Sequence, residues 1–288
     1  MKIACLIVTY TSAVQTKRMI DRLNNGQFDF YIHLDKKVNI KTHQLLFEIP
    51  NVYFIKNRVD VRWAGYSTVQ AAFNGIKQIT SSGIEYSFIN LITGQDYPIK
   101  PAEYITDFLE HNVGKEFIEY KGFDTDWTEA KERIEKYHFT NLRVIGKDHL
   151  ARIFNFFFRH RKMPVNMLMY GISTFWTLSP ACALYVVNYV EKNTAFRRFV
   201  KYTWGVDEFI FQTVLMNSAY KDTIINKNYR YMDWSAGGAR PKFLGIEDFD
   251  KIMASDAFFG RKFNIDKDEH ILAMIDEQCL ETNPNKIS

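Results

Sequence analysis

Short apolar runs alternate with amphipathic stretches along the first third of the chain. The runs are rich in β-branched and aromatic residues, which predicts buried strands at 2–9, 28–34, 51–56 and 86–91. Helical spacing of the apolar positions between them predicts helices at 16–23, 42–48 and 67–80. Strands that alternate with helices predict an α/β fold: a Rossmann-type mixed sheet, mainly parallel, flanked by helices on both faces.

The pattern becomes less regular from about residue 114. We expect further strands at 116–120 and 173–179, helices at 128–138 and 204–217, and a frayed tail from about Cys279. No linker-like composition divides the chain, so we expect one domain over residues 1–288. Within it we expect a nucleotide-binding half at about 1–115, an acceptor half at about 116–265 and a C-terminal tail at about 266–288.

Composition and charge narrow the classes of function. With 47% hydrophobic and 24% charged residues the chain is typical of a soluble globular protein. The net charge of +4 suits an anionic ligand in a local site, whereas a nucleic-acid track would need clustered Lys and Arg, so we expect no nucleic-acid partner. Three scattered cysteines and the absence of a glycosylation sequon favour the cytoplasm.

A basic and aromatic segment at 150–170 has two interpretations. It could lie on a membrane surface, which would make the protein peripheral at the inner membrane. The alternative is a hydrophobic helix that packs on the core or under a loop.

Several polar and aromatic residues follow the predicted strands, where ligands of open α/β sheets bind. Thr9 and Tyr10 end the first strand, and Asp35 ends the second. Asp35 could accept hydrogen bonds from a ribose or simply form a turn with the two lysines after it. Trp63, in RWAGYS, could stack on a base or sugar, or be buried to anchor the next helix.

The adjacent acids Asp207 and Glu208 stand at the head of an apolar run. Acids in a first helical turn interact favourably with the helix dipole by about 0.3–1 kcal/mol, which would explain one of them. A general base needs a carboxylate beside a ligand pocket, and Trp204 would supply an aromatic wall there. Glu119, in a strand-like stretch, could face solvent or bind sugar hydroxyls.

Basic residues late in the chain could clamp a diphosphate. They are Arg240 and Lys242 in GARPKFL and Arg261 and Lys262 in FFGRKF, and ordinary surface charge is the alternative for each.

Three Asp-x-Asp pairs provide a possible metal site, but chance alone produces such pairs and none follows an apolar strand at the expected sheet edge. We therefore expect no metal. The pairs begin at Asp124, Asp248 and Asp266.

Seven motifs in this order resemble the core-2/I-branching β-1,6-N-acetylglucosaminyltransferases and the related peptide O-xylosyltransferases, which form glycosyltransferase family 14. The resemblance covers roughly residues 1–265. The motifs are YIHLDKK, RWAGYSTVQAAF, FINLITGQDYPI, GISTFWTLS, DEFIFQTVLMNS, YRYMDW and FFGRKF.

The resemblance implies a GT-A fold and inverting transfer of a sugar, most often N-acetylglucosamine, from a UDP-sugar without a metal or other cofactor. It implies a glycan acceptor, with UDP-xylose or UDP-glucose as alternative donors. A non-catalytic glycan- or nucleotide-binding protein on the same fold is the alternative from another class. Animal members have a Golgi anchor, a stem and disulfides that this sequence does not show, so we expect a bacterial relative.

Carried over residue by residue, the resemblance gives Glu208 as the catalytic base. It places the nucleoside against Asp35 and Trp63, with Thr9 and Tyr10 where other members carry a histidine. The resemblance assigns the diphosphate to Arg240 and Lys262 and the acceptor to Glu119. We also expect Arg133 and Trp204 to contact the acceptor.

Overall fold

A computed structural model describes residues 1–158 and 161–281 of the chain. Seven strands form one sheet in the order β3-β2-β1-β4-β7-β6-β8, and among the described residues only β7 runs against the rest. The strands are β1 (Ile3–Thr9), β2 (Phe28–Leu34), β3 (Val52–Phe54), β4 (Phe88–Thr93), β6 (Glu116–Gly122), β7 (Tyr170–Leu178) and β8 (Ile224–Ile225). The predicted mixed, mainly parallel α/β sheet is confirmed.

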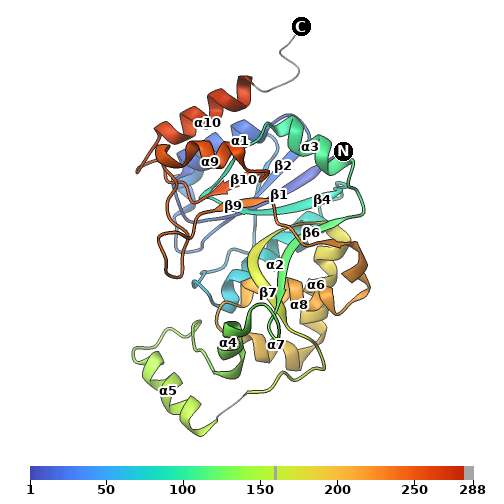
Figure 1. The fold of residues 1–288 in the computed structure, drawn as a ribbon, viewed down its shortest axis with the longest axis vertical. Coiled ribbons are helices and arrows are strands. Elements are labelled where there is room, and N and C mark those ends of the chain that lie inside the picture. Colours follow the sequence, from blue (N-terminus) through green and yellow to red (C-terminus); the bar gives the residue numbers. More distant parts are fainter. Residues whose placement is uncertain (159–160, 282–288) are drawn as a thin grey trace.

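Helices cover both faces of this sheet (Figure 1). The side chains of β1 alternate between two hydrophobic clusters, because successive residues of a strand point to opposite faces. One face carries α2 (Tyr66–Thr80), α6 (Pro180–Lys192), α7 (Thr194–Lys201) and α8 (Ile210–Met216). The other carries α1 (Ala13–Leu23), α3 (Ala102–Glu110), α9 (Phe249–Ala254) and α10 (His270–Glu281).

A second, small sheet brings late parts of the chain to the carboxyl end of β4. Its order is β5-β10-β9, with β5 (Asp96–Pro98), β10 (Phe259–Arg261) and β9 (Arg230–Met232). The register sets Arg261 directly opposite Asp96. The FFGRKF and TGQDYP motifs, more than a hundred residues apart, therefore share one edge of the molecule.

A long excursion joins β6 to β7. It contains α4 (Lys131–Glu135) and α5 (Lys147–Phe157), and α5 stands apart from the layered body at the bottom of Figure 1.

Four predicted elements were wrong in detail. The helix expected at 42–48 is a 3₁₀ helix, Ile40–Leu46, and the one expected at 128–138 is only a 3₁₀ turn followed by α4. The helix expected at 204–217 is interrupted at Phe209, which has φ −141° and ψ −17° and packs its buried ring against Phe123. The tail does not fray at Cys279, which is buried within α10, while residues 282–288 lie outside the described range.

Candidate active site

A cavity of about 530 Å³ opens at the carboxyl ends of β1, β2 and β4. Part of its wall comes from β7, and residues 232–243 and 261–262 close another side. The structure brings seven predicted site residues to this lining: Thr9, Tyr10, Asp35, Trp63, Glu208, Arg240 and Lys262.

Positive charge gathers at one end of the cavity. Burial and the nearby guanidinium groups of Arg261 and Arg240 lower the pKa of Lys262 to about 8. Arg240 lies over the ring of Trp63 at 4.9 Å from its centroid, and Arg261 lies over that of Phe175 at 4.2 Å. Cations held close together in a partly desolvated site repel one another, so an anion bound between them would relieve that repulsion.

Arg261 pairs with Asp96, a residue that the sequence analysis did not single out. Asp96 is fully buried; its Oδ2 accepts a hydrogen bond from the Thr93 hydroxyl at 2.8 Å, and its Oδ1 lies 3.4 Å from Arg261 Nε. A buried carboxylate needs a charged partner, and an acid directly after a buried strand was the available signal. Lys242, by contrast, turns away from the cavity and pairs with Asp248 at 2.7 Å.

Glu208 reaches the cavity from a sharply bent segment. Gly205 adopts left-handed φ of 67°, and a Cβ there would lie 2.9 Å from Arg133 Nη1. Glycine therefore suits both the backbone shape and the close approach of that guanidinium. Arg133 donates a hydrogen bond to Glu208 Oε2.

Arg133 and Trp204, predicted as acceptor contacts, lie behind Glu208 and not in the cavity lining. The guanidinium of Arg133 sits 4.5 Å from the ring centroid of Trp204 and 4.6 Å from that of Trp127. Trp204 in turn packs edge-on against Trp63 at 5.3 Å, and Gly205 N donates to Ala64 O at 2.8 Å. The RWAGYS and WGVDE segments thus touch, and Arg133 holds the Glu208 carboxylate in place.

Asp207 also lines the cavity, next to Glu208. Its Oδ2 accepts a hydrogen bond from Thr174 Oγ1 at 3.0 Å, while its buried Oδ1 has no hydrogen-bond partner among the described residues. Burial, followed by the charge of Glu208, raises the pKa of Asp207 to about 6. Asp207 stands in the first turn of the 3₁₀ segment Val206–Glu208, and its side chain caps neither that turn nor α8.

Asp35 forms the predicted strand-end turn, whereas its contact with a ribose stays a prediction. The buried carboxylate accepts a hydrogen bond from Lys37 N at 2.9 Å and pairs with Lys37 Nζ at 2.9 Å, as a strand-end turn would. It also lines the cavity. Nearby, a Cβ on Gly94 would lie 2.1 Å from Thr9 Oγ1, so only glycine lets the β4 loop approach β1 this closely.

Glu119 lies one layer behind the cavity wall. Its Oε2 accepts a hydrogen bond from Asn228 Nδ2 at 2.7 Å, and the same amide donates to Ser173 Oγ at 3.0 Å. Ser173 lines the cavity, so Glu119 is linked to it through Asn228.

The Asp-x-Asp pairs all lie away from the cavity lining. Asp124 pairs with Lys131 at 2.7 Å, and Asp268 accepts a hydrogen bond from Ile246 N at 3.1 Å. In the described ranges, no three His, Cys, Asp or Glu side chains cluster closely enough to hold a metal ion.

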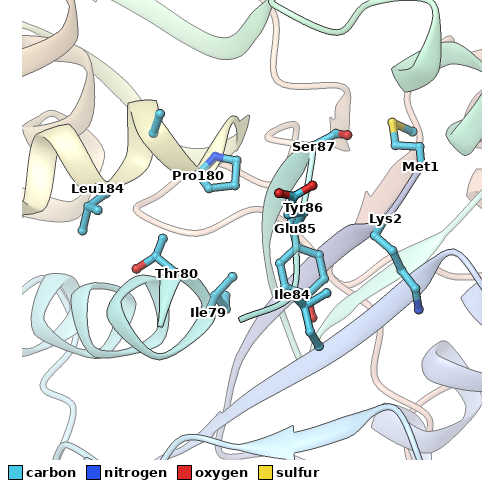
Figure 2. Close-up of a pocket in the computed structure, with 11 residues that line it drawn as sticks. Met1, Lys2, Ile79, Thr80, Ile84, Glu85, Tyr86, Ser87, Pro180 and Leu184 are labelled. Atoms are coloured by element: carbon cyan, nitrogen blue, oxygen red, sulfur yellow. The ribbon is translucent and has the colours of Figure 1, made fainter. Parts of the chain in front are cut away.

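A second cavity, about 650 Å³, lies at the opposite edge of the sheet, where β1 and β4 begin (Figure 2). Four polar side chains at or beside it are paired with one another. Tyr86 OH donates to Asp29 Oδ2 at 2.7 Å and contacts Tyr31 OH at 3.0 Å, while Lys2 Nζ lies 3.0 Å from Asp29 Oδ1.

Residues 3–253 match the family model described as Branch: Core-2/I-Branching enzyme. The chain is 26% identical to Xylosyltransferase 2 of Rattus norvegicus over 303 residues, 96% of this chain and 33% of that protein. It is 23% identical to Xylosyltransferase oxt of Drosophila melanogaster over 286 residues, 91% and 32% of the two. The chain therefore spans about a third of the length of the curated relatives it matches.

Among solved structures, that of the galactosyltransferase LgtC in complex with donor and acceptor sugar analogues is similar at a TM-score of 0.48. The two chains are 8% identical, and the superposition covers 96% of each.

Proposed function

The chain belongs to the Core-2/I-Branching enzyme family, and from that premise we propose that it is a glycosyltransferase acting on a UDP-sugar and a glycan hydroxyl. One observation carries the proposal. A cationic end formed by Arg240, Arg261 and Lys262 shares a single cavity with the carboxylates of Asp207 and Glu208. Cations suit a departing diphosphate, and a carboxylate suits removal of a proton from the attacking alcohol.

The proposed reaction is one inverting displacement. The acceptor oxygen forms a bond to the anomeric carbon as the bond from that carbon to the diphosphate breaks, and UDP leaves with the electron pair. Glu208 takes the proton of the acceptor hydroxyl, with Arg133 fixing the carboxylate. Arg240, Arg261 and Lys262 stabilise the charge that develops on the leaving diphosphate without needing a metal ion.

The nucleoside would lie between Asp35 and Trp63, near Thr9 and Tyr10, and all four residues line the cavity. N-acetylglucosamine is the sugar that we propose first. Xylose fits equally, since the curated relatives are named xylosyltransferases, and glucose is a further candidate. Glu119 and Trp204 lie behind the cavity lining, so we propose that they support the acceptor side indirectly, where Arg133 holds the base.

Turnover of separate UDP-sugars tests this proposal and its rival, a binding protein without catalysis. The full chain is incubated with UDP-N-acetylglucosamine, UDP-xylose or UDP-glucose and a panel of glycans, with EDTA in excess. We expect UDP release and a mass increase of one glycan equal to one sugar. Binding of a UDP-sugar without any product would support the rival. Transfer that EDTA abolishes and manganese restores would overturn metal independence.

The expected bacterial origin and cytoplasmic location stay predictions. Fractionation of the source cells would check the location.

A further inference from the structure

The helix α5 stands apart from the layered body of the described chain (Figure 1). It belongs to the excursion between β6 and β7 and lies beyond α4, away from the sheet and its covering helices (Figure 1). A protruding helix keeps its place only if one of its faces is anchored.

One face of α5 is anchored to the segment that follows α4. The ring of Phe154 packs against Tyr137 at 4.9 Å and Phe139 at 5.6 Å. Asn155 brackets the backbone of Tyr137, because its Oδ1 accepts from Tyr137 N at 2.7 Å and its Nδ2 donates to Tyr137 O at 2.9 Å. These contacts explain the apolar Phe154 on the side of α5 that faces the protein. They do not explain the apolar residues on its other side.

A second apolar stripe points outward. Leu150, Ile153 and Phe157 follow one another at helical spacing and are 44%, 58% and 73% exposed. The exposed side chains of Val144 and Ile145 precede them in the chain. Soluble proteins rarely expose a continuous apolar surface of this kind unless it contacts a partner or a membrane.

The charges around the stripe indicate whether it contacts a protein partner or a membrane. The sequence from 142 to 162 contains six Lys or Arg and one acid. Arg152, on the helix itself, and Lys162, just beyond it, are both exposed. A helix with a bulky apolar face and basic flanks matches the interface of an anionic bilayer, where rings enter the acyl boundary and cations meet the headgroups.

We propose that the outer stripe of α5 docks this protein in the plane of an anionic lipid surface. The helix is 11 residues long, far short of the roughly 20 needed to cross a bilayer, so it would lie along the surface. Elsewhere in the described chain, too, no helix is long and apolar enough for a span. Contact through α5 is therefore peripheral and reversible.

Co-sedimentation with vesicles tests this assignment. The full chain is mixed with vesicles of phosphatidylglycerol and phosphatidylcholine, or of phosphatidylcholine alone. We expect binding to the anionic vesicles that weakens as salt rises, and little binding to the neutral ones. Ile153→Ser combined with Phe157→Ser should lower the partition coefficient by about tenfold or more, since two apolar side chains no longer enter the interface.

The matched control is Ile84→Ser combined with Val113→Ser, which removes two exposed aliphatic side chains on other parts of the surface. It should bind anionic vesicles like the wild type. Arg152→Gln with Lys162→Gln should reduce binding to the anionic vesicles and remove most of its salt dependence.

Equal sedimentation of the wild type and the Ile153→Ser, Phe157→Ser variant would overturn the proposal. So would a wild type that binds no vesicles but dimerises through this face, shown by light scattering as a dimer that the same variant dissociates. Thermal unfolding of each variant verifies that a loss of binding does not come from a loss of fold.

Discussion

Two cavities of comparable volume, about 530 and 650 Å³, lie at opposite edges of the same sheet. At the amino edge, the carboxylate of Asp29 is matched by Lys2 and Tyr86. At the carboxyl edge, Asp207 Oδ1 has no hydrogen-bond partner within the part of the chain that the structure describes, and two guanidinium groups lie near Lys262. The two cavities therefore differ less in volume than in whether the charged groups named here are paired.

The largest expected effect at the carboxyl-edge cavity is that of Glu208→Gln. Loss of the base should reduce transfer by about 10²–10⁴-fold, because an amide cannot accept the proton. Affinity for UDP, measured by calorimetry, should stay within a few-fold of the wild type. A fully active Gln variant would remove Glu208 as the base.

Asp207→Asn is the matched control, since it changes the neighbouring acid of the same cavity. It should reduce transfer much less than Glu208→Gln does. The wild type should also lose a modest part of its activity below about pH 6, where Asp207 becomes protonated. Asp207→Asn should show that modest loss at every pH, because its amide is always neutral, and so lack this acid limb. If Asp207→Asn has the larger effect, the unpaired Oδ1 marks the base instead.

The cations should give the next largest effect. Arg261→Gln and Lys262→Met should each weaken UDP binding by about tenfold to a hundredfold, as expected for the loss of one charge-assisted hydrogen bond to a phosphate. Lys2→Met, which removes a cation at the other cavity, should leave UDP binding unchanged. Equal losses in all three variants would mean that the two cavities do not differ as described.

The pH dependence of UDP binding tests the role of the Lys262 charge at the carboxyl-edge cavity. The pKa of Lys262 in the empty site is about 8, so the side chain is a cation below that pH and loses its charge as pH rises through it. UDP affinity should therefore fall between pH 7 and 9 in the wild type. In Lys262→Met the fall should be smaller, and calorimetry at several pH values would check both.

The smallest effect on binding should come from Tyr86→Phe. The change removes the donor to Asp29 Oδ2 in a buried network, and an unsatisfied buried acceptor costs about 1–3 kcal/mol of unfolding free energy. UDP affinity should stay the same while thermal stability falls. Weaker UDP binding without loss of stability would show that the amino-edge cavity communicates with the site.

Much of the sheet could be predicted because its strands carry a local pattern. The observed β2 begins and ends at the predicted residues, 28 and 34, and β1 differs by one residue. The segments predicted less well depend on distant contacts. Phe209 breaks the expected helix where it packs on Phe123, and no local spacing specifies that contact.

The candidate site also contains residues that the sequence could place and contacts that it could not predict. Residues that follow a strand, such as Thr9 and Asp35, could be placed at the sheet edge from the order of the elements alone. Two pairings could not be predicted from the order of the elements, because the fold brings together segments that are far apart in the sequence. Arg133 and Glu208 are 75 residues apart, and Asp96 and Arg261 are 165 residues apart.

The sequence by itself determined the alternation of strands and helices, the edge of the sheet where chemistry would gather and the residue types that could perform it. Only the tertiary structure decided which charges are paired and which line the cavity. The reason is physical: hydrophobic periodicity is local, whereas the partner of a buried charge is whatever group the folded chain brings within about 4 Å of it.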